Sequence, residues 1–173
     1  MMKLLAALAI TVLTANVGLA QQRAPAEAVT FAKKVAAANT FEIESSQLAL
    51  EHAPSADVKS FAQQMISDHT KAGEEFKQAI AAAGVSPPPP EGPDPKQNAT
   101  LAKLRHAEGS AFEKTYISAQ LKAHKEAVAL FRKYARSGRT PALKDFAGKT
   151  LPVLQHHLEM VEGLSRKSGI ASR

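Results

Sequence analysis

The sequence of 173 residues contains no cysteine and no tryptophan. Without cysteine the chain can form no disulfide, no thiolate metal site and no cysteine nucleophile, and it can carry no lipid on a cysteine. Aromatic residues make up only 5% of the chain, which argues against a groove that stacks sugars. Charges of both signs alternate along the sequence, so the net charge of +6 forms no basic stripe of the kind that nucleic-acid binding requires.

Long apolar runs are also scarce, and the one that is present lies at the amino end. Lys3 precedes it, residues 4–17 form it, and the small residues Gly18 and Ala20 occupy positions −3 and −1 of a cut after Ala20. This pattern is typical of a secretory signal peptide, and the run is shorter than the roughly 18 to 20 apolar residues of a spanning helix. We expect residues 1–20 to be removed and the mature chain to be exported, with the periplasm as the best-fitting destination. No feature supports attachment to the outer membrane, and the mature chain has no second hydrophobic span.

The rest of the chain repeats apolar residues at the helical spacing of three and four. This pattern predicts four long helices, over residues 28–52, between Ser55 and Gly84, over 109–136, and from the Thr140–Pro141 pair to about 166. A short helix is expected at 98–106, and no strand is predicted. Ser55 and Thr140 are expected to cap the helices that follow them.

Prolines gather in residues 85–96, where six of the ten in the chain occur, so we expect an extended connector between the second and third long helices. The predicted organisation is a signal peptide (1–20), a flexible lead-in (21–28), a four-helix bundle (29–166) and a frayed tail (167–173). Whether the third long helix runs parallel or antiparallel to the second stays open.

Four polar side chains interrupt the apolar faces of the predicted helices, one on each long helix. At 100° per residue, they are Glu42, His69, His124 and His157. Glu42 and His69 lie on the two helices of the first hairpin, and His124 and His157 on those of the second. Counted from the turn within each hairpin, the two residues differ in height along the bundle by only roughly 4–5 Å. The four groups are therefore expected to meet near the middle of the bundle.

Three imidazoles and one carboxylate suit a transition-metal ion such as zinc, copper, iron or manganese, and such a set can leave a coordination position open. A dinuclear carboxylate centre would require Glu-x-x-His pairs. The residues three positions before the histidines are Ile66, Leu121 and Leu154 instead. A single metal site in the bundle core is the first hypothesis.

The second hypothesis is a non-catalytic cell-envelope or stress-related interaction module that binds an envelope protein and no metal. In that case each inward polar group would be satisfied by a neighbouring side chain, and the four groups would pair off or lie more than about 8 Å apart. No nucleophile–base pair supports an enzyme that works without metal, and whether the chain is an enzyme stays open.

Three segments carry a resemblance to a known family: FEIESSQLALEHAPSADVKSFAQQMISDHTKA, FEKTYISAQLKAHKEAVALF and LKDFAGKTLPVLQHHLEMV. They resemble the two hairpins of the bacterial family known as domain of unknown function 4142, whose members are described as predicted outer-membrane proteins. The resemblance implies a ferritin-like four-helix bundle over about residues 29–164. It also implies that the recurring polar positions of the family fall on Glu42, His69, His124 and His157.

Overall fold

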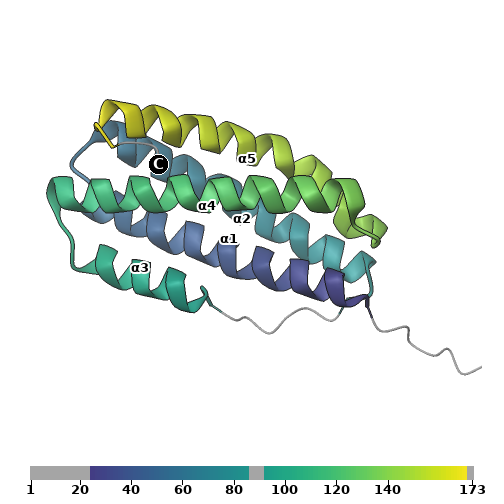
Figure 1. Cartoon of the computed structure of the whole chain (residues 1–173). Helices are drawn as coiled ribbons and strands as arrows, with labels where there is room; N and C mark the ends of the chain where they lie inside the picture. Colours follow the sequence, from purple (N-terminus) through teal and green to yellow (C-terminus); the bar gives the residue numbers. More distant parts are fainter. Residues whose placement is uncertain (1–23, 86–91, 171–173) are drawn as a thin grey trace, which may run out of the picture.

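The computed structural model describes residues 24–85 and 92–170. Every regular element in those residues is a helix: α1 (Ala26–His52), α2 (Ala56–Ala82), α3 (Pro95–Arg105), α4 (Gly109–Ser137) and α5 (Pro141–Lys167) (Figure 1). The predicted all-α, ferritin-like bundle of four long helices is confirmed, with α3 as a short fifth helix. The predicted signal peptide and residues 86–91 of the proline-rich connector lie outside the described residues.

The four long helices form a ring in which α1 contacts α2, α2 contacts α5, α5 contacts α4, and α4 contacts α1. The start of α4 lies beside the start of α2, because Glu113 accepts a hydrogen bond from the backbone N–H of Ser55 at 2.7 Å. At the same end Lys167 pairs with Asp57 at 2.7 Å, so α5 runs antiparallel to α2. The helices α2 and α4 therefore run in the same direction (Figure 1), which is the single crossover of ferritin-like bundles.

Local chemistry explains both ends of α2. The Ser55 hydroxyl accepts a hydrogen bond from the backbone N–H of Val58 at 3.4 Å, and Gly84 has the positive φ (60°) that glycine adopts most easily after a helix. Thr140 is the N-cap residue of α5 by position, as predicted, but its side chain is buried and does not cap the first turn.

The packed bundle begins earlier and ends later in the sequence than predicted. The helix α1 begins at Ala26, inside the predicted lead-in, and Ala28 is fully buried in the core. In the predicted tail, the backbone N–H of Ile170 donates to the carbonyl of Ser165 at 3.0 Å, and Ile170 packs against the core. Residues 21–23 and 171–173 lie outside the described residues.

Two apolar clusters fill the bundle, one toward each end. The first contains Phe61, Met65 and Tyr116, and the second contains Phe31 and Phe131. Between them lies a layer of buried polar residues: Glu42, Ser45, His69, Gln120, His124 and His157. The fold thus surrounds one polar layer with apolar packing above and below.

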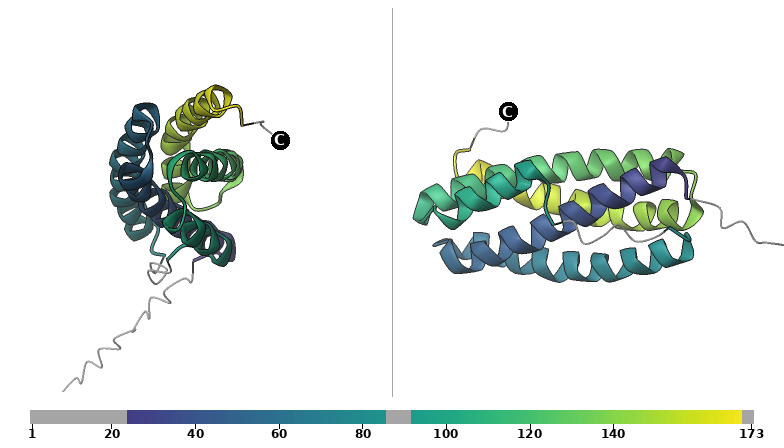
Figure 2. Two further views of the ribbon diagram at one scale, coloured as in Figure 1. Left: turned by 90° about the vertical axis from the view of Figure 1, so that its left-hand side faces the viewer. Right: turned by 90° about the horizontal axis from the view of Figure 1, so that it is seen from below.

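The short helix α3 lies outside the ring of four, alongside α1 and α4 (Figure 2). It begins three residues earlier than predicted, because Asp94 and Gln97 form a capping box at its start. Two of its side chains, Leu101 and Leu104, are fully buried in the first apolar cluster. The helix is therefore an integral part of the core. No helix in the described part of the chain is long and apolar enough to cross a membrane.

The variant Leu104→Ala should lower the free energy of unfolding by about 2–5 kcal/mol, since it removes a fully buried side chain and leaves a cavity. Urea denaturation followed by far-ultraviolet circular dichroism measures the change. The neighbouring exposed residue provides the control: Lys103→Ala should shift stability by less than about 0.5 kcal/mol. Similarly small effects of both substitutions would contradict the packing described for α3.

Candidate metal centre

The four polar residues predicted to point inward are all buried. Their exposed fractions are 3% for Glu42, 8% for His69, 1% for His124 and 1% for His157. The neighbouring polar residue His156 is exposed. Helical periodicity therefore identified the side of each helix that faces the core.

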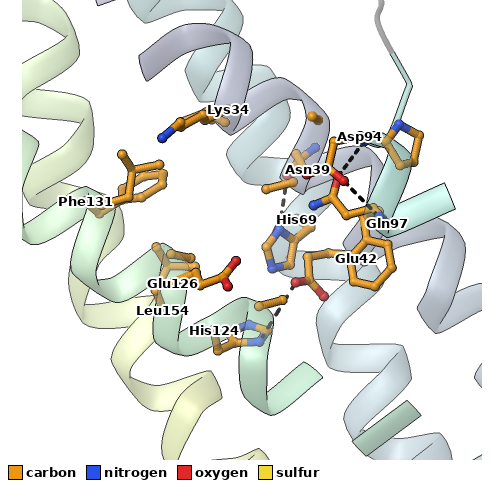
Figure 3. A pocket seen from close by; sticks show the side chains of 18 of the residues that line it. Lys34, Asn39, Glu42, His69, Asp94, Gln97, His124, Glu126, Phe131 and Leu154 are labelled. Carbon is orange, nitrogen blue, oxygen red and sulfur yellow. Dashed lines mark hydrogen bonds and ion pairs between the residues drawn. The ribbon is translucent and has the colours of Figure 1, made fainter. Parts of the chain in front are cut away.

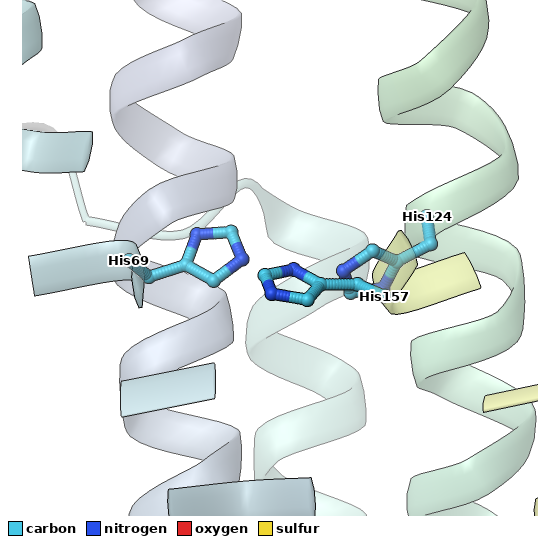
Figure 4. Close-up of side chains that lie close together, drawn as sticks. All are labelled: His69, His124 and His157. Carbon is cyan, nitrogen blue, oxygen red and sulfur yellow. The ribbon is translucent and has the colours of Figure 1, made fainter. Parts of the chain in front are cut away.

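The three histidines come from α2, α4 and α5 and meet in one cluster (Figure 4). Their ring centroids form a nearly equilateral triangle, with sides of 6.1 Å (His69–His124), 5.6 Å (His69–His157) and 5.5 Å (His124–His157). One nitrogen of each ring can be chosen so that all three lie within 4.8 Å of one another. Nitrogens bound to one ion at 2.0–2.1 Å lie about 3.4 Å apart in tetrahedral geometry, so small rotations of the three rings would place them on a single ion.

Two of the histidines are held by a hydrogen bond at the Nδ1 atom. Nδ1 of His124 lies 2.9 Å from the backbone carbonyl oxygen of Gln120, which can only accept, so this nitrogen carries the proton. Nδ1 of His69 lies 3.1 Å from the side-chain oxygen of Asn39 and donates to it in the same way. Each ring is thereby left with the lone pair on Nε2.

The third histidine is held through its other ring nitrogen, Nε2. Nε2 of His157 donates to the carboxylate of Asp68 at 2.8 Å, so its lone pair is on Nδ1. These three remaining nitrogens, Nε2 of His69, Nε2 of His124 and Nδ1 of His157, are buried and have no hydrogen-bond partner among the described residues. Three lone pairs of neutral imidazoles thus converge where nothing in the described chain binds them.

Burial keeps the histidines uncharged. It lowers the pKa of His69 to about 3, with a further contribution from the positive charge that His124 and His157 would carry. It lowers the pKa of His124 to about 4, although the Gln120 carbonyl opposes the shift. Burial also lowers the pKa of His157, against the pull of Asp68. At neutral pH all three rings are in the form that binds metal ions.

The predicted fourth group, Glu42, lies beside the cluster and not within it. Its Oε1 atom is 4.0 Å from Nδ1 of His124, and its Oε2 atom is buried without a partner (Figure 3). Burial raises the pKa of this carboxyl to about 8, although the Gln120 side chain works against the rise. Next to it, the Gln120 amide donates to Ser45 at 3.0 Å.

Sequence reasoning missed the groups that orient the rings. Asp68 directly precedes His69, and its role could not be predicted because its side chain reaches a histidine 89 positions further along the chain. Asn39 lies one helical turn before Glu42 on the same face of α1, and that spacing is the signal that could have identified it. The second hypothesis required each inward group to be satisfied by a neighbour. In the structure, one nitrogen of each histidine ring has a hydrogen-bond partner, and the other nitrogen has none among the described residues.

Comparisons with known proteins agree with this fold. A family model described as Domain of unknown function (DUF4142) matches residues 14–164. The chain is also similar to the crystal structure of a DUF305 fragment from Deinococcus radiodurans, with a TM-score of 0.72 and 16% identity, over 84% of this chain and 99% of that one. At this identity the likeness shows the helical fold alone. A comparison with curated proteins found no match.

The metal-free protein should be most stable near pH 6.5. Below that pH the unfolded chain takes up protons on histidines that stay neutral when folded, so stability falls as the pH falls. Above it, Glu42 keeps its proton up to about pH 8 in the folded chain but ionises from about 4.5 when unfolded. Stability should therefore decline again, by on the order of 2 kcal/mol between pH 6.5 and 8.

Thermal unfolding in the presence of a chelator, followed across the pH range, measures this profile. The variant Glu42→Gln should abolish the decline above pH 6.5 and keep the loss on the acid side. A wild-type profile that rises steadily through pH 8, or a decline that persists in Glu42→Gln, would show that this carboxyl is not buried as described.

Proposed function

The chain belongs to the DUF4142 family, and from that premise and the geometry of its core we propose that it is an exported protein that binds one transition-metal ion. The ion would be held by Nε2 of His69, Nε2 of His124 and Nδ1 of His157. The observation that carries this proposal is the convergence of three buried, unpartnered lone pairs. A buried polar atom without a partner costs free energy, and an ion would satisfy all three atoms at once.

The groups behind the rings support the proposal. Histidines that bind metals almost always donate their other N–H to a carboxylate, a backbone carbonyl or water. Here His157 donates to the Asp68 carboxylate and His124 to a backbone carbonyl. These hydrogen bonds fix the ring orientation and direct the lone pairs inward before any ion arrives.

The nature of the donors selects the class of metal. Three neutral imidazole nitrogens suit zinc, copper, iron or nickel better than calcium or magnesium, which prefer oxygen. A doubly charged ion in an apolar core also requires negative charge nearby. The Asp68 carboxylate, 2.8 Å from Nε2 of His157, supplies it. Among the metals considered from the sequence, zinc and copper fit best, followed by iron; manganese prefers oxygen ligands.

Export is part of this proposal and rests on residues 1–20. Their short positive region, apolar run and small residues before the cut are those of a signal peptide. An ion would then be captured outside the cytoplasm, by nitrogen and oxygen ligands alone. Fractionation of cells that produce the full chain, with mass determination of the mature amino end, tests this.

Untagged protein should bind about one zinc or copper(II) ion per chain, as measured by titration calorimetry and metal analysis. The variant His157→Gln should lose more affinity than the roughly 10–100-fold that loss of an outer partner costs. The adjacent exposed residue gives a matched control, since His156→Gln changes the same chemistry on the same helix and should bind the metal normally. Absence of binding by the wild type, or an equal loss in both variants, would overturn the proposal.

The variant Asp68→Asn should weaken metal binding by roughly 10–100-fold, because an amide carries no negative charge and accepts the Nε2–H of His157 more weakly than a carboxylate does. Competition with a chromophoric chelator measures the affinity. The control Glu159→Gln removes one carboxylate charge from an exposed position on α5 and should have little effect. If both variants lose affinity equally, only the overall charge of the protein matters and Asp68 does not position His157.

A further inference from the structure

A cleft of about 820 Å³ opens between α1 and α4 and leads to the histidine cluster (Figure 3). The segment 92–97, at the start of α3, lines part of it. The volume falls within the roughly 300–1,000 Å³ that small-molecule sites occupy. A site that only held an ion would need no such space, so the cleft requires an explanation of its own.

Small side chains make room for this cleft. Six alanines line it, two from α1, one from α2 and three from α4: Ala37, Ala38, Ala72, Ala119, Ala123 and Ala127. Alanine removes the bulk that would otherwise fill the space between two neighbouring helices. The opening is therefore encoded in the sequence of the two helices that form it.

The floor of the cleft carries buried polar atoms that point to a ligand. His69, His124 and Glu42 line it, and each has a buried side-chain atom without a hydrogen-bond partner in residues 24–85 and 92–170. His157 does not line it, so the ion would be reached from the side of His69 and His124. A coordination position left open by three histidines would face the cleft.

The walls and the rim differ in character. Phe76, Phe131 and Phe146 form an apolar wall, whereas Lys34 and Lys122 are exposed lysines at the rim. Three acidic side chains also line the cleft: Asp94 is engaged in capping α3, Glu42 is buried at the floor, and Glu126 is exposed. An apolar wall favours hydrocarbon, and lysines at the entrance attract anions.

Resting on the proposed metal site, the geometry points to a cleft that binds an organic carboxylate with a hydrocarbon chain. Its carboxylate group fills the open position of the ion, and its chain lies against the phenylalanines. The lysines at the rim raise the local concentration of such anions. The protein therefore binds a metal and an amphipathic acid together, as a ternary complex.

Titration calorimetry with decanoate on the zinc-loaded full-length mature protein tests this. Decanoate should bind with a stoichiometry of one, at least about tenfold more tightly than decanol or acetate, and at least about tenfold more weakly to metal-free protein. Equal affinity for decanol would overturn the role of the carboxylate. Equal affinity for acetate would overturn the role of the apolar wall.

Matched variants test the location. Ala127→Leu fills the cleft and should weaken decanoate binding by at least about tenfold, while the exposed neighbour Ala129→Leu on the same helix should not. The surface double variant Lys34→Glu with Lys122→Glu, which does not disturb the core, should slow decanoate association, and Lys125→Glu outside the cleft should not. If neither cleft variant has an effect, decanoate binds elsewhere and the inference fails.

Zinc binding is measured first in the same experiment, which separates the two claims. A protein that binds no zinc contradicts the proposed function. A protein that binds zinc at the histidine cluster but does not bind decanoate contradicts the inference about the cleft and leaves the metal site intact. Retained zinc affinity in Ala127→Leu also shows that this variant is folded.

Discussion

Three imidazole nitrogens lie buried in the middle of the bundle with no partner in the described part of the chain. They are the constraint on which the rest of the structure depends. Each such atom costs about 1–3 kcal/mol relative to a satisfied one, and here three lie together. The bundle tolerates them because apolar clusters on both sides supply the burial that stabilises the fold. This cost falls at one point, on three different helices, and it is the reason that we propose a bound ion there.

The crossover topology serves this arrangement. It brings α4 beside α1 as well as beside α5, so that the histidine cluster is enclosed by helices but still reachable through the seam between α1 and α4. The rings are fixed from behind by three different acceptors: an amide oxygen, a backbone carbonyl and a carboxylate. The lone pairs are thus oriented by groups that do not themselves touch the ligand position, which is how proteins prepare a metal site in advance.

Helical periodicity was enough to predict the four long helices and the burial of Glu42 and the three histidines, because both follow from local spacing. The direction of α4 could not be predicted, since a long connector permits either course. The partner of His157 could not be predicted either, because Asp68 reaches His157 across the bundle from another hairpin. Glu42 was predicted at the right height, yet it lies toward the Nδ1 side of His124. A helical wheel gives the direction in which a side chain leaves its helix. It does not give the rotamer, which decides which ring atom of His124 the Glu42 carboxyl approaches.

The central claim is that three specific nitrogen atoms bind one ion. Its most direct test is a crystal structure of the zinc-loaded mature protein with anomalous scattering measured at the zinc edge. The account predicts one anomalous peak between α2, α4 and α5, about 2.0–2.1 Å from Nε2 of His69, Nε2 of His124 and Nδ1 of His157. A peak that is confined to exposed side chains, or a zinc ion that contacts fewer than three of these atoms, would contradict it.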